Sequence, residues 1–340
     1  MRKTFAILLV LLLAGCQPRD RYIQISGYAQ GGTYTVKCNL KGVKVSPEAV
    51  RDSVEAILFH IDTTLSGYNK GSQLSRFNAG ETIRPNTLFV DAYTLARDWF
   101  ERSGGLLDFA AGPLYDAWGF GFRSGEMPSD DEVRALVASS GMKLLPERLP
   151  IRDGRLDPSE MGFPRLNYNA VAQGYSCDLV ARYLYSIGVK DMLVDIGEIY
   201  CDGSNPSGQP WSVGVDRPID GNQEKGAQLS GVWSSGGGPV GIVTSGNYRK
   251  FYIRDGRKYA HTINPLTGYP VSHRLLSATV VAPDAASADA LATWCMVLGA
   301  EGAQKLILSD AALEGYLISA AEDGSMEEWV SPGFALTTSR

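Results

Sequence analysis

The sequence is poor in the residues that build zinc and redox sites. Among 340 residues it has three histidines and five cysteines. No two cysteines have C-x-x-C spacing, and His60, His261 and His273 do not form a closely spaced pair. Such spacings are the usual signature of zinc sites and dithiol redox centres. The sequence therefore supports neither.

The sequence also lacks an excess of basic residues. It has 32 Lys and Arg against 37 Asp and Glu, a net charge of −5, and no basic stripe. We therefore expect no nucleic acid among its partners. The composition, 44% hydrophobic and 20% charged, is that of a globular chain rather than a disordered one. No linker, repeat or low-complexity tract divides it, so we expect one folded domain over residues 22–335.

Only the N-terminus carries an apolar run that stands apart from the rest of the chain. Arg2-Lys3 precede an apolar stretch from Phe5 to Leu13, which is too short to remain as a membrane-spanning helix. We interpret residues 1–15 as a signal segment. It ends in Leu13-Ala14-Gly15-Cys16, which resembles the bacterial lipobox. That resemblance implies cleavage before Cys16, acylation of Cys16 and a polar tether over residues 16–21.

Acylation of Cys16 would determine where the protein is located in the cell. Several acyl chains hold a protein stably on a membrane, so we expect a lipoprotein of the bacterial cell envelope, facing the periplasm or the cell exterior. The alternative is a buried N-terminal element with a chance cysteine. An exported protein can form disulfides, but the spacing gives no pairing. Buried thiols are the favoured interpretation for the four remaining cysteines: Cys38, Cys177, Cys201 and Cys295.

The pattern of apolar residues mixes helices and strands without regular alternation. Ser46-Pro47, the Ser129/Glu132 capping box and Gly188 mark two helix starts and a helix end. The mixture favours an α+β fold with a mixed or antiparallel sheet flanked by helices. Expected helices cover 47–61, 86–103, 129–141, 170–187 and 287–298, and expected strands cover 22–36 (interrupted at Gly31-Gly32), 192–196, 211–215, 240–244, 250–254, 258–263 and 275–281, with a last hairpin turning at Asp323-Gly324.

The last expected helix carries a pair of oxygen-bearing side chains. Asp289 and Thr293 stand four residues apart, so they project from one face of the helix. A carboxylate beside a hydroxyl offers two hard oxygen ligands, which suit Mg²⁺ or Ca²⁺. The alternative is that Asp289 is an acid of the first turn, stabilised by the helix dipole.

Two polar segments suggest further chemistry. Thr244-Ser245-Gly246 follows an apolar strand, where hydroxyls and backbone N–H groups suit an anion such as a phosphate. His261 precedes a turn rich in Pro and Gly, which makes it a candidate base. His60 lies within an apolar helix, where a structural role is favoured.

Taken together, these segments resemble a known family. Their order along residues 22–330 is similar to that of the ApbE-type FAD:protein FMN transferases. The motifs that carry the resemblance are Gln30-Gly31-Gly32-Thr33-Tyr34, Leu65-Ser66-Gly67-Tyr68, Ser75-Arg76-Phe77-Asn78, Gly112-Pro113-Leu114, Trp118-Gly119-Phe120-Gly121, Ala172-Gln173-Gly174-Tyr175, Thr244 to Arg249, His261 to Gly268, and Ala288 to Thr293.

The resemblance implies a single α+β unit that holds FAD in a cleft. The implied reaction moves FMN from FAD to a Thr or Ser hydroxyl of an exported or membrane flavoprotein and releases AMP. Mg²⁺, with Ca²⁺ or Mn²⁺ as alternatives, would be held by Asp289, Thr293 and the backbone carbonyl of Ala170. His261 would take the proton of the acceptor hydroxyl. The positions implied to contact FAD are Gln30, Tyr68, Leu106, Leu107, Asp108, Gln173 and Ile263.

Four positions depart from the family pattern. Gln173 stands where lysine is common, and Gln cannot replace a cation electrostatically. Asn167 and Asn264 stand where acids are usual, and Asn247 stands where Asp is frequent. Because one cation and several acids are lost together, the local charge is roughly conserved. Two other interpretations remain open on these grounds: an FAD pyrophosphatase, and a non-catalytic FAD-binding lipoprotein.

Overall fold

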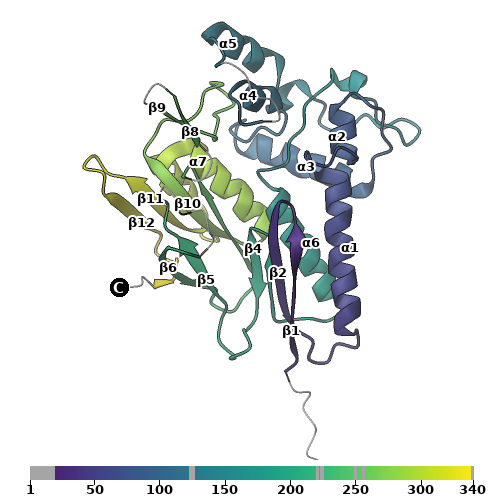
Figure 1. Ribbon diagram of the computed structural model, residues 1–340, viewed down its shortest axis with the longest axis vertical. Coiled ribbons are helices and arrows are strands. Elements are labelled where there is room, and N and C mark those ends of the chain that lie inside the picture. The colour runs from purple at the N-terminus through teal and green to yellow at the C-terminus, as the bar shows by residue number, and fades with distance from the viewer. Residues whose placement is uncertain are drawn as a thin grey trace, which may run out of the picture.

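An antiparallel sheet of eight strands forms the centre of the molecule, in the order β1-β2-β3-β4-β7-β10-β11-β12 (Figure 1). The computed structural model describes residues 20–121, 127–219, 222, 226–248, 251–254 and 257–337. The strands are β1 Tyr22–Ala29, β2 Gly32–Asn39, β3 Met192–Asp195, β4 Ile199–Asp202, β5 Ser212–Asp216, β6 Leu229–Ser234, β7 Val240–Gly246, β8 Phe251–Arg254, β9 Arg257–Ala260, β10 Leu275–Ala282, β11 Glu314–Ala320, β12 Met326–Val330 and β13 Leu336–Thr337.

Seven helices lie in the described ranges, together with two short 3₁₀ helices. The α-helices are α1 Pro47–Leu65, α2 Gln73–Asn78, α3 Thr87–Arg102, α4 Gly112–Ala117, α5 Asp130–Ser139, α6 Ala172–Ser186 and α7 Ala285–Leu308, and the 3₁₀ helices cover Met142–Leu144 and Pro158–Met161. Every pairing between the described strands is antiparallel. The expected α+β class with an antiparallel sheet is therefore confirmed.

The two faces of the large sheet are covered differently. Helices α6 and α7 pack together and against β3, β4, β7, β10 and β11 on one face (Figure 1). The small sheet β13-β6-β5 covers part of the other face, where Trp211 and Trp233 meet Tyr316 and Phe334 in a second apolar cluster. Helices α3, α4 and α5 lie toward one end of the molecule, with the β8–β9 hairpin near them (Figure 1).

Local sequence signals place several elements correctly. The Ser46 hydroxyl accepts from the N–H of Ala49 at the start of α1. Ser129 and Glu132 form the expected capping box of α5. Gln30 and Gly31 both have positive φ and close a two-residue turn between β1 and β2, the geometry that twisted hairpins favour. The short helices α2 and α4 were not foreseen from the sequence.

Two boundaries differ from expectation. Strand β9 ends at Ala260 rather than at residue 263, so His261 lies in the segment that follows the strand. The last helix extends beyond residue 298 but breaks at Gly299, which has φ 77° and ψ 177°. A Cβ at Gly299 would lie 3.0 Å from the ring of His273, so glycine is required there for packing as well as for φ.

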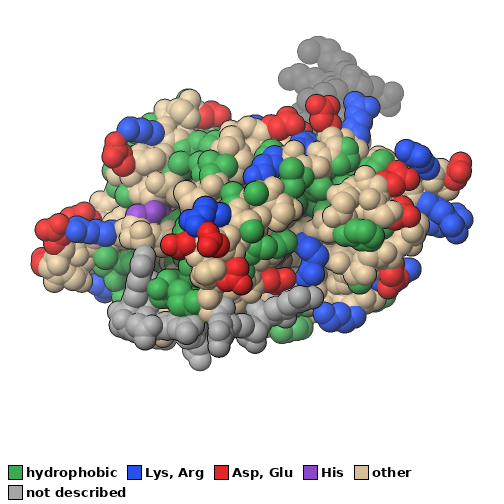
Figure 2. Space-filling view, turned by 90° about the horizontal axis from the view of Figure 1, so that it is seen from above, with side chains coloured by type: hydrophobic (Ala, Val, Ile, Leu, Met, Phe, Trp, Pro, Cys, Tyr) green, Lys and Arg blue, Asp and Glu red, His purple; other side chains and the backbone are tan. Residues whose placement is uncertain are grey.

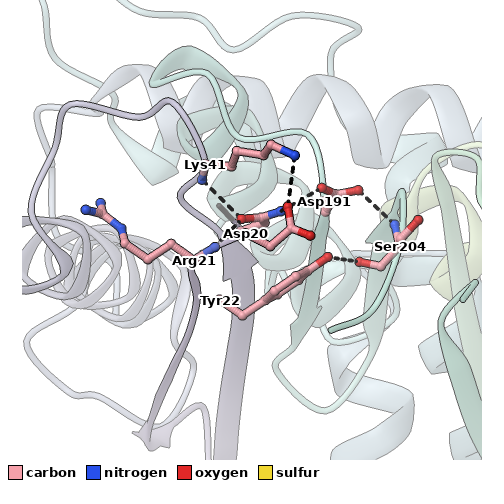
Figure 3. A network of polar contacts seen from close by, with 7 residues as sticks. Asp20, Arg21, Tyr22, Lys41, Asp191 and Ser204 are labelled. Atoms are coloured by element: carbon pink, nitrogen blue, oxygen red, sulfur yellow. Dashed lines mark hydrogen bonds and ion pairs between the residues drawn. The ribbon is translucent and has the colours of Figure 1, made fainter. Parts of the chain in front are cut away.

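The first described residues are tied to the body of the fold (Figure 3). The Asn39 side chain is buried and accepts from the N–H groups of Arg21 and Lys41 while donating to Asp20 and Asp191. Lys41 also pairs with Asp20 at 3.2 Å. Asp20 and Arg21, which we assigned to the tether, are thus already bonded to the domain.

Several expectations concern residues outside the described ranges. These are the signal segment 1–15, Cys16, Arg249 and the turn at Asp255-Gly256 that would join the expected strands 250–254 and 258–263 into a hairpin. The other four cysteines are buried free thiols, as expected. Among the helices that the structure describes, none is long and apolar enough to cross a bilayer.

Candidate functional site

Asp289 lies at the start of α7 and is buried, with 5% of its surface exposed. Its Oδ2 accepts a hydrogen bond of 3.0 Å from the N–H of Gly174, at the start of α6. Burial raises the pKa of Asp289 to about 7, and the nearby Asp178 carboxylate adds to that rise while the Gly174 N–H opposes it. A buried carboxylate is costly unless its charge is compensated. Asp289 is therefore placed where a cation would be stabilising.

Asp178 is a second buried carboxylate, on α6. It accepts from the N–H groups of Ala285 and Ala286, each at 2.9 Å, at the start of α7. Burial raises its pKa to about 6, against the lowering effect of these two N–H groups. The two helices thus each offer a carboxylate to the other's N-terminus.

Glycines allow this close approach. A Cβ at Gly174 would lie 2.1 Å from the carbonyl oxygen of Ala285, and a Cβ at Gly241 of β7 would lie 2.4 Å from the Cα of Ala285. No side chain fits at either position. The start of α7 is therefore wedged between α6 and β7, which fixes the position of Asp289 one turn later.

Thr293 faces the end of β7. Its Oγ1 lies 3.5 Å from the Oγ of Ser245. The adjacent Thr244 points to the opposite face, as alternate strand residues do, and its hydroxyl contacts that of Thr279 at 2.8 Å. We expected Thr244-Ser245-Gly246 to follow a strand, but all three residues belong to β7. Ser245 consequently adds a hydroxyl beside the Asp289/Thr293 pair.

Ala170 lies in the segment that enters α6. In a regular helix the N–H of Gly174 would bond the carbonyl of residue 170, four positions back. Here that N–H is directed to Asp289. The Ala170 carbonyl therefore does not receive the N–H of Gly174, which Asp289 takes instead.

The donor set fits a hard divalent cation. It combines one carboxylate, hydroxyls and a backbone carbonyl, the ligand types that Mg²⁺ and Ca²⁺ prefer. Within the described residues no group of three or more His, Cys, Asp or Glu side chains could hold a metal. A metal site at Asp289 would thus rely on Thr293 and Ala170 to complete its protein ligands.

Two glutamines expected to contact FAD gather at the same end of α6. Gln30, in the β1–β2 turn, donates to the hydroxyl of Ser176 at 2.5 Å. Gln173 donates to the carbonyl of Ile196 at 3.2 Å and packs on Gly197, whose φ is +99°. Gln30 itself has φ +52°, an uncommon conformation for a residue other than glycine. Such strain often accompanies functional positions.

His261 belongs to a series of aromatic contacts. Its ring meets Phe120 edge-on, with 6.4 Å between centroids. Phe120 stacks on Tyr252, and Tyr252 stacks on Tyr259, at 5.1 and 5.2 Å. Tyr259 stacks in turn on Trp118, at 6.0 Å. Phe120, which follows α4, therefore contacts both the ring of His261 and the rings of the β8–β9 hairpin.

A hydrogen bond connects the His261 segment to the residues that follow β7. The hydroxyl of Thr262 donates to Asn247 at 2.7 Å, and Asn247 lies two residues after Ser245. Asn264 caps its own turn by accepting from the N–H groups of Leu266 and Thr267. The indole N–H of Trp118 donates to the carbonyl of Gly268 at 2.7 Å. Asn247 and Asn264 thus act as turn and bridging residues, roles that need no charge.

The expected FAD position at Asp108 lines a pocket of about 230 Å³. Its walls also include Gly104, Gly105, Ala111 and Pro265-Leu266, whereas Leu106 and Leu107 do not line it. Asp108 accepts from the N–H groups of Ala110 and Met142, and burial raises its pKa. Leu106 is half-buried. The N–H of Asn167 donates to the carbonyl of Phe109 at 2.8 Å, which connects this region to the segment entering α6.

The remaining expected positions differ in exposure. Tyr68 is 70% exposed on the loop after α1, where its ring is accessible for stacking. The side chains of Leu107 and Ile263 pack in apolar clusters, so a ligand there would meet their backbone atoms.

The surface of the molecule shows no single kind of side chain gathered on the face in Figure 2, which mixes charges of both signs with apolar patches. His60 is exposed on α1 rather than packed in the apolar face of that helix.

Sequence inspection missed Asp178 altogether and did not single out Phe120 or Asn247 for their contacts. A lone acid on the otherwise apolar segment of α6 is the only local signal of Asp178. Its partners at the start of α7 lie 107 residues later. Backbone N–H groups carry no sequence signature, so this connection required the fold.

The fold and the site together define a class: a single α+β unit in which a buried aspartate is followed one turn later by a threonine beside Ser245 of β7, and in which a histidine after β9 contacts an aromatic ring. The chain belongs to the ApbE family, whose model matches residues 30–317. It is 32% identical to the FAD:protein FMN transferase of Vibrio cholerae over 97% of this chain and 96% of that protein. The enzyme of that name from Escherichia coli is also 32% identical, over 88% and 84% of the two chains.

Solved structures agree with this assignment. The flavin transferase ApbE from Vibrio cholerae superimposes with a TM-score of 0.75 at 29% identity, covering 92% of this chain and 98% of that chain. The apo form of Pseudomonas stutzeri flavinyl transferase ApbE also gives 0.75, at 31% identity and 92% and 95% coverage. The fold expected from the family resemblance is thereby confirmed.

Proposed function

We propose that this protein is an FAD:protein FMN transferase in which Asp289, Thr293 and the carbonyl of Ala170 hold a divalent cation at the diphosphate of FAD. About 30% identity over nearly the whole chain supports the activity. The observation that carries the cation site is the buried Asp289 carboxylate, which uses Oδ2 for Gly174 and keeps Oδ1 for a further partner. Mg²⁺ bound there would neutralise charge that develops on the diphosphate.

The reaction proposed at this site is a phosphoryl transfer. The oxygen of an acceptor Thr or Ser forms a bond to the phosphorus of the FMN half, and the P–O bond to AMP breaks. His261 accepts the proton of the attacking hydroxyl. The contact between the rings of His261 and Phe120 restricts the position of the base, which such a transfer requires. The products are an FMN phosphoester on the acceptor and free AMP.

The FAD-binding positions are proposed on the same basis. Gln30 and Gln173 flank the start of α6, and the pocket beside Asp108 lies near the His261–Gly268 segment. Tyr68 offers an exposed ring for stacking. Because Gln173 bonds a backbone carbonyl, we propose that it orients the ligand without contributing charge.

A labelling experiment tests the activity. The protein is incubated with FAD, Mg²⁺ and a threonine-containing acceptor, and the acceptor is weighed by mass spectrometry. A gain of one FMN supports transfer. Free FMN and AMP without acceptor labelling would show hydrolysis instead, and unchanged FAD would show binding alone.

We also propose that Cys16 is lipidated and anchors the protein in the cell envelope. The lipobox-like Leu13-Ala14-Gly15-Cys16 supports this proposal. The network around Asn39 lies at the end of the molecule remote from α4 and the β8–β9 hairpin (Figure 1). An anchored protein would therefore present its site away from the membrane. Mass spectrometry of the membrane fraction, with and without Cys16→Ser, tests the anchor.

A further inference from the structure

Helices α6 and α7 cap each other through buried carboxylates. Val171, at the N-cap position of α6, provides no side-chain cap. The N–H of Gly174 donates instead to Asp289 of α7, at 3.0 Å. In return, Asp178 of α6 receives the N–H groups of Ala285 and Ala286, the first two of α7. Each helix thus satisfies backbone donors of the other that would otherwise be buried without a partner.

The start of α7 has two separate carboxylate caps. Asp284, the residue just before the helix, accepts from the N–H of Ser287 at 2.7 Å and from the N–H of Ala288 through its carbonyl at 3.1 Å. These bonds are local and would form in an isolated helix. The two bonds to Asp178 span 107 and 108 residues. Asp284 therefore caps the helix, and Asp178 attaches it to α6.

The spacing of the four groups links the caps to the candidate cation site. Asp178 follows Gly174 by four residues, and Asp289 follows Ala285 by four, so each carboxylate lies one turn beyond the amides that the other carboxylate binds. A slip of α7 by one residue would rotate Asp289 by about 100° around the helix axis. It would then no longer face Gly174 and the Ala170 turn.

We infer that Asp178 is a positioning residue for Asp289, holding α7 at the one register in which Asp289, Thr293 and the Ala170 carbonyl face a common cation. This inference rests on the proposed function, because it needs Asp289 to be a cation ligand. Groups that orient metal ligands typically alter affinity by 10- to 100-fold when they are replaced.

The test measures cation affinity without the reaction. Mn²⁺ is titrated into the full chain in the absence of FAD, and free Mn²⁺ is followed by electron paramagnetic resonance. The variants are Asp178→Asn, which keeps the size of the side chain but can accept at only one oxygen, and the control Asp284→Ala, which removes the side-chain cap of the same helix. Asp289→Asn reports on the cation site itself.

We expect Asp178→Asn to weaken Mn²⁺ binding about tenfold, with Asp284→Ala within about twofold of the wild type although both variants lower Tm. Unchanged Mn²⁺ affinity in Asp178→Asn would overturn the inference. If Asp289→Asn loses Mn²⁺ binding in the same experiment, the proposed cation site still stands. Equal weakening of Mn²⁺ binding by Asp178→Asn and Asp284→Ala would also overturn the inference, because it would indicate general loosening of α7. If the wild type does not bind Mn²⁺, or if Asp289→Asn binds it as tightly as the wild type, the proposed cation site is wrong and the inference about Asp178 is wrong with it.

A measurement on the wild type covers the case in which Asp178→Asn does not fold. Hydrogen exchange of the amides of Gly174, Ala285 and Ala286 is compared with and without Mg²⁺. The inference predicts that all three slow together, because cation binding at Asp289 stabilises the paired caps. Slowing confined to Gly174 would contradict the coupling.

Discussion

The two halves of the candidate site are built by different means. On the acid side, which we define as the starts of α6 and α7 with the end of β7, regular elements meet at glycines, and carboxylates bond backbone N–H groups. On the histidine side, defined as α4, the β8–β9 hairpin and residues 261–270, stacked rings and turn bonds hold the chain.

The difference shows which half can tolerate change. A buried carboxylate that loses its partners leaves polar groups unsatisfied, and these are costly. A half-buried ring that loses a stacking neighbour forfeits only about 0.5–1.5 kcal/mol. Substitutions on the acid side should therefore abolish transfer activity, whereas substitutions on the histidine side should lower it gradually.

The largest effect is expected for Asp289→Ala. Removing the only carboxylate of the proposed cation site should lower Mg²⁺-dependent transfer by about a thousandfold or more. The rate is measured by acceptor labelling over a range of Mg²⁺ concentrations. Thr293→Ser, which keeps the hydroxyl, serves as the control and should retain most activity. Undiminished transfer by Asp289→Ala would contradict the assignment of Asp289 as a cation ligand.

The next effect is expected for His261→Ala. Loss of the proposed base should slow transfer by about 10²- to 10⁴-fold while FAD affinity, measured by fluorescence titration, stays close to that of the wild type. His60→Ala provides a histidine control on the exposed face of α1 and should behave as wild type. Should rate and FAD affinity fall together in His261→Ala, the residue binds FAD rather than acting as a base.

A smaller effect is expected for Phe120→Leu. The substitution removes the ring that lies between His261 and Tyr252, so His261 should sample more orientations. We expect kcat to fall about tenfold with KM for FAD unchanged, because a misplaced base affects the transition state more than ground-state binding. Phe163→Leu, an exposed aromatic away from these contacts, is the matched control. A change in KM alone would assign Phe120 to ligand binding.

The smallest effect concerns His273, which packs on the break in α7. Its Nε2 bonds the carbonyl of Met296 at 2.8 Å, and its Nδ1 accepts from the N–H of Leu275. These bonds satisfy the neutral ring, and burial lowers its pKa below the usual 6.5. The unfolded chain therefore binds this proton more tightly than the folded one, so stability falls as pH drops through about 6.5.

The comparison of His273→Gln with the wild type isolates this contribution. The variant should be less stable at pH 8 but should lose less stability between pH 7 and pH 5, as measured by urea unfolding at each pH. Parallel pH profiles of the two proteins would show that the pKa of His273 is the same in the folded and the unfolded chain.

Much of the architecture followed from short-range sequence patterns. Ser46-Pro47, the Ser129/Glu132 box and Gly188 mark helix ends through contacts over three or four residues. The end predicted at residue 298 matches the break at Gly299, although the chain resumes a helix afterwards. The short helices α2 and α4 escaped notice because six residues carry too little periodicity.

The candidate site was predictable only in part. Asp289 and Thr293 share a helix face by their spacing, and the ordered motifs pointed to the family. Ser245 was expected in a loop after a strand, yet it lies inside β7, opposite Thr293. Nothing local indicates that Thr262 bonds Asn247, or that Phe120 contacts His261, because these residues come from separate loops.

The sequence alone determined the α+β class, the helix caps, the hairpin turns and the presence of an acid–hydroxyl pair, since each depends on residues a few positions apart. The tertiary structure decided how the pair is used. It buried Asp289, gave it the Gly174 amide from 115 residues away and attached α7 to α6 through Asp178. The reason is physical: the partners are backbone N–H groups, which every residue except proline possesses, so only the packing of two helices at glycines selects the ones that bond.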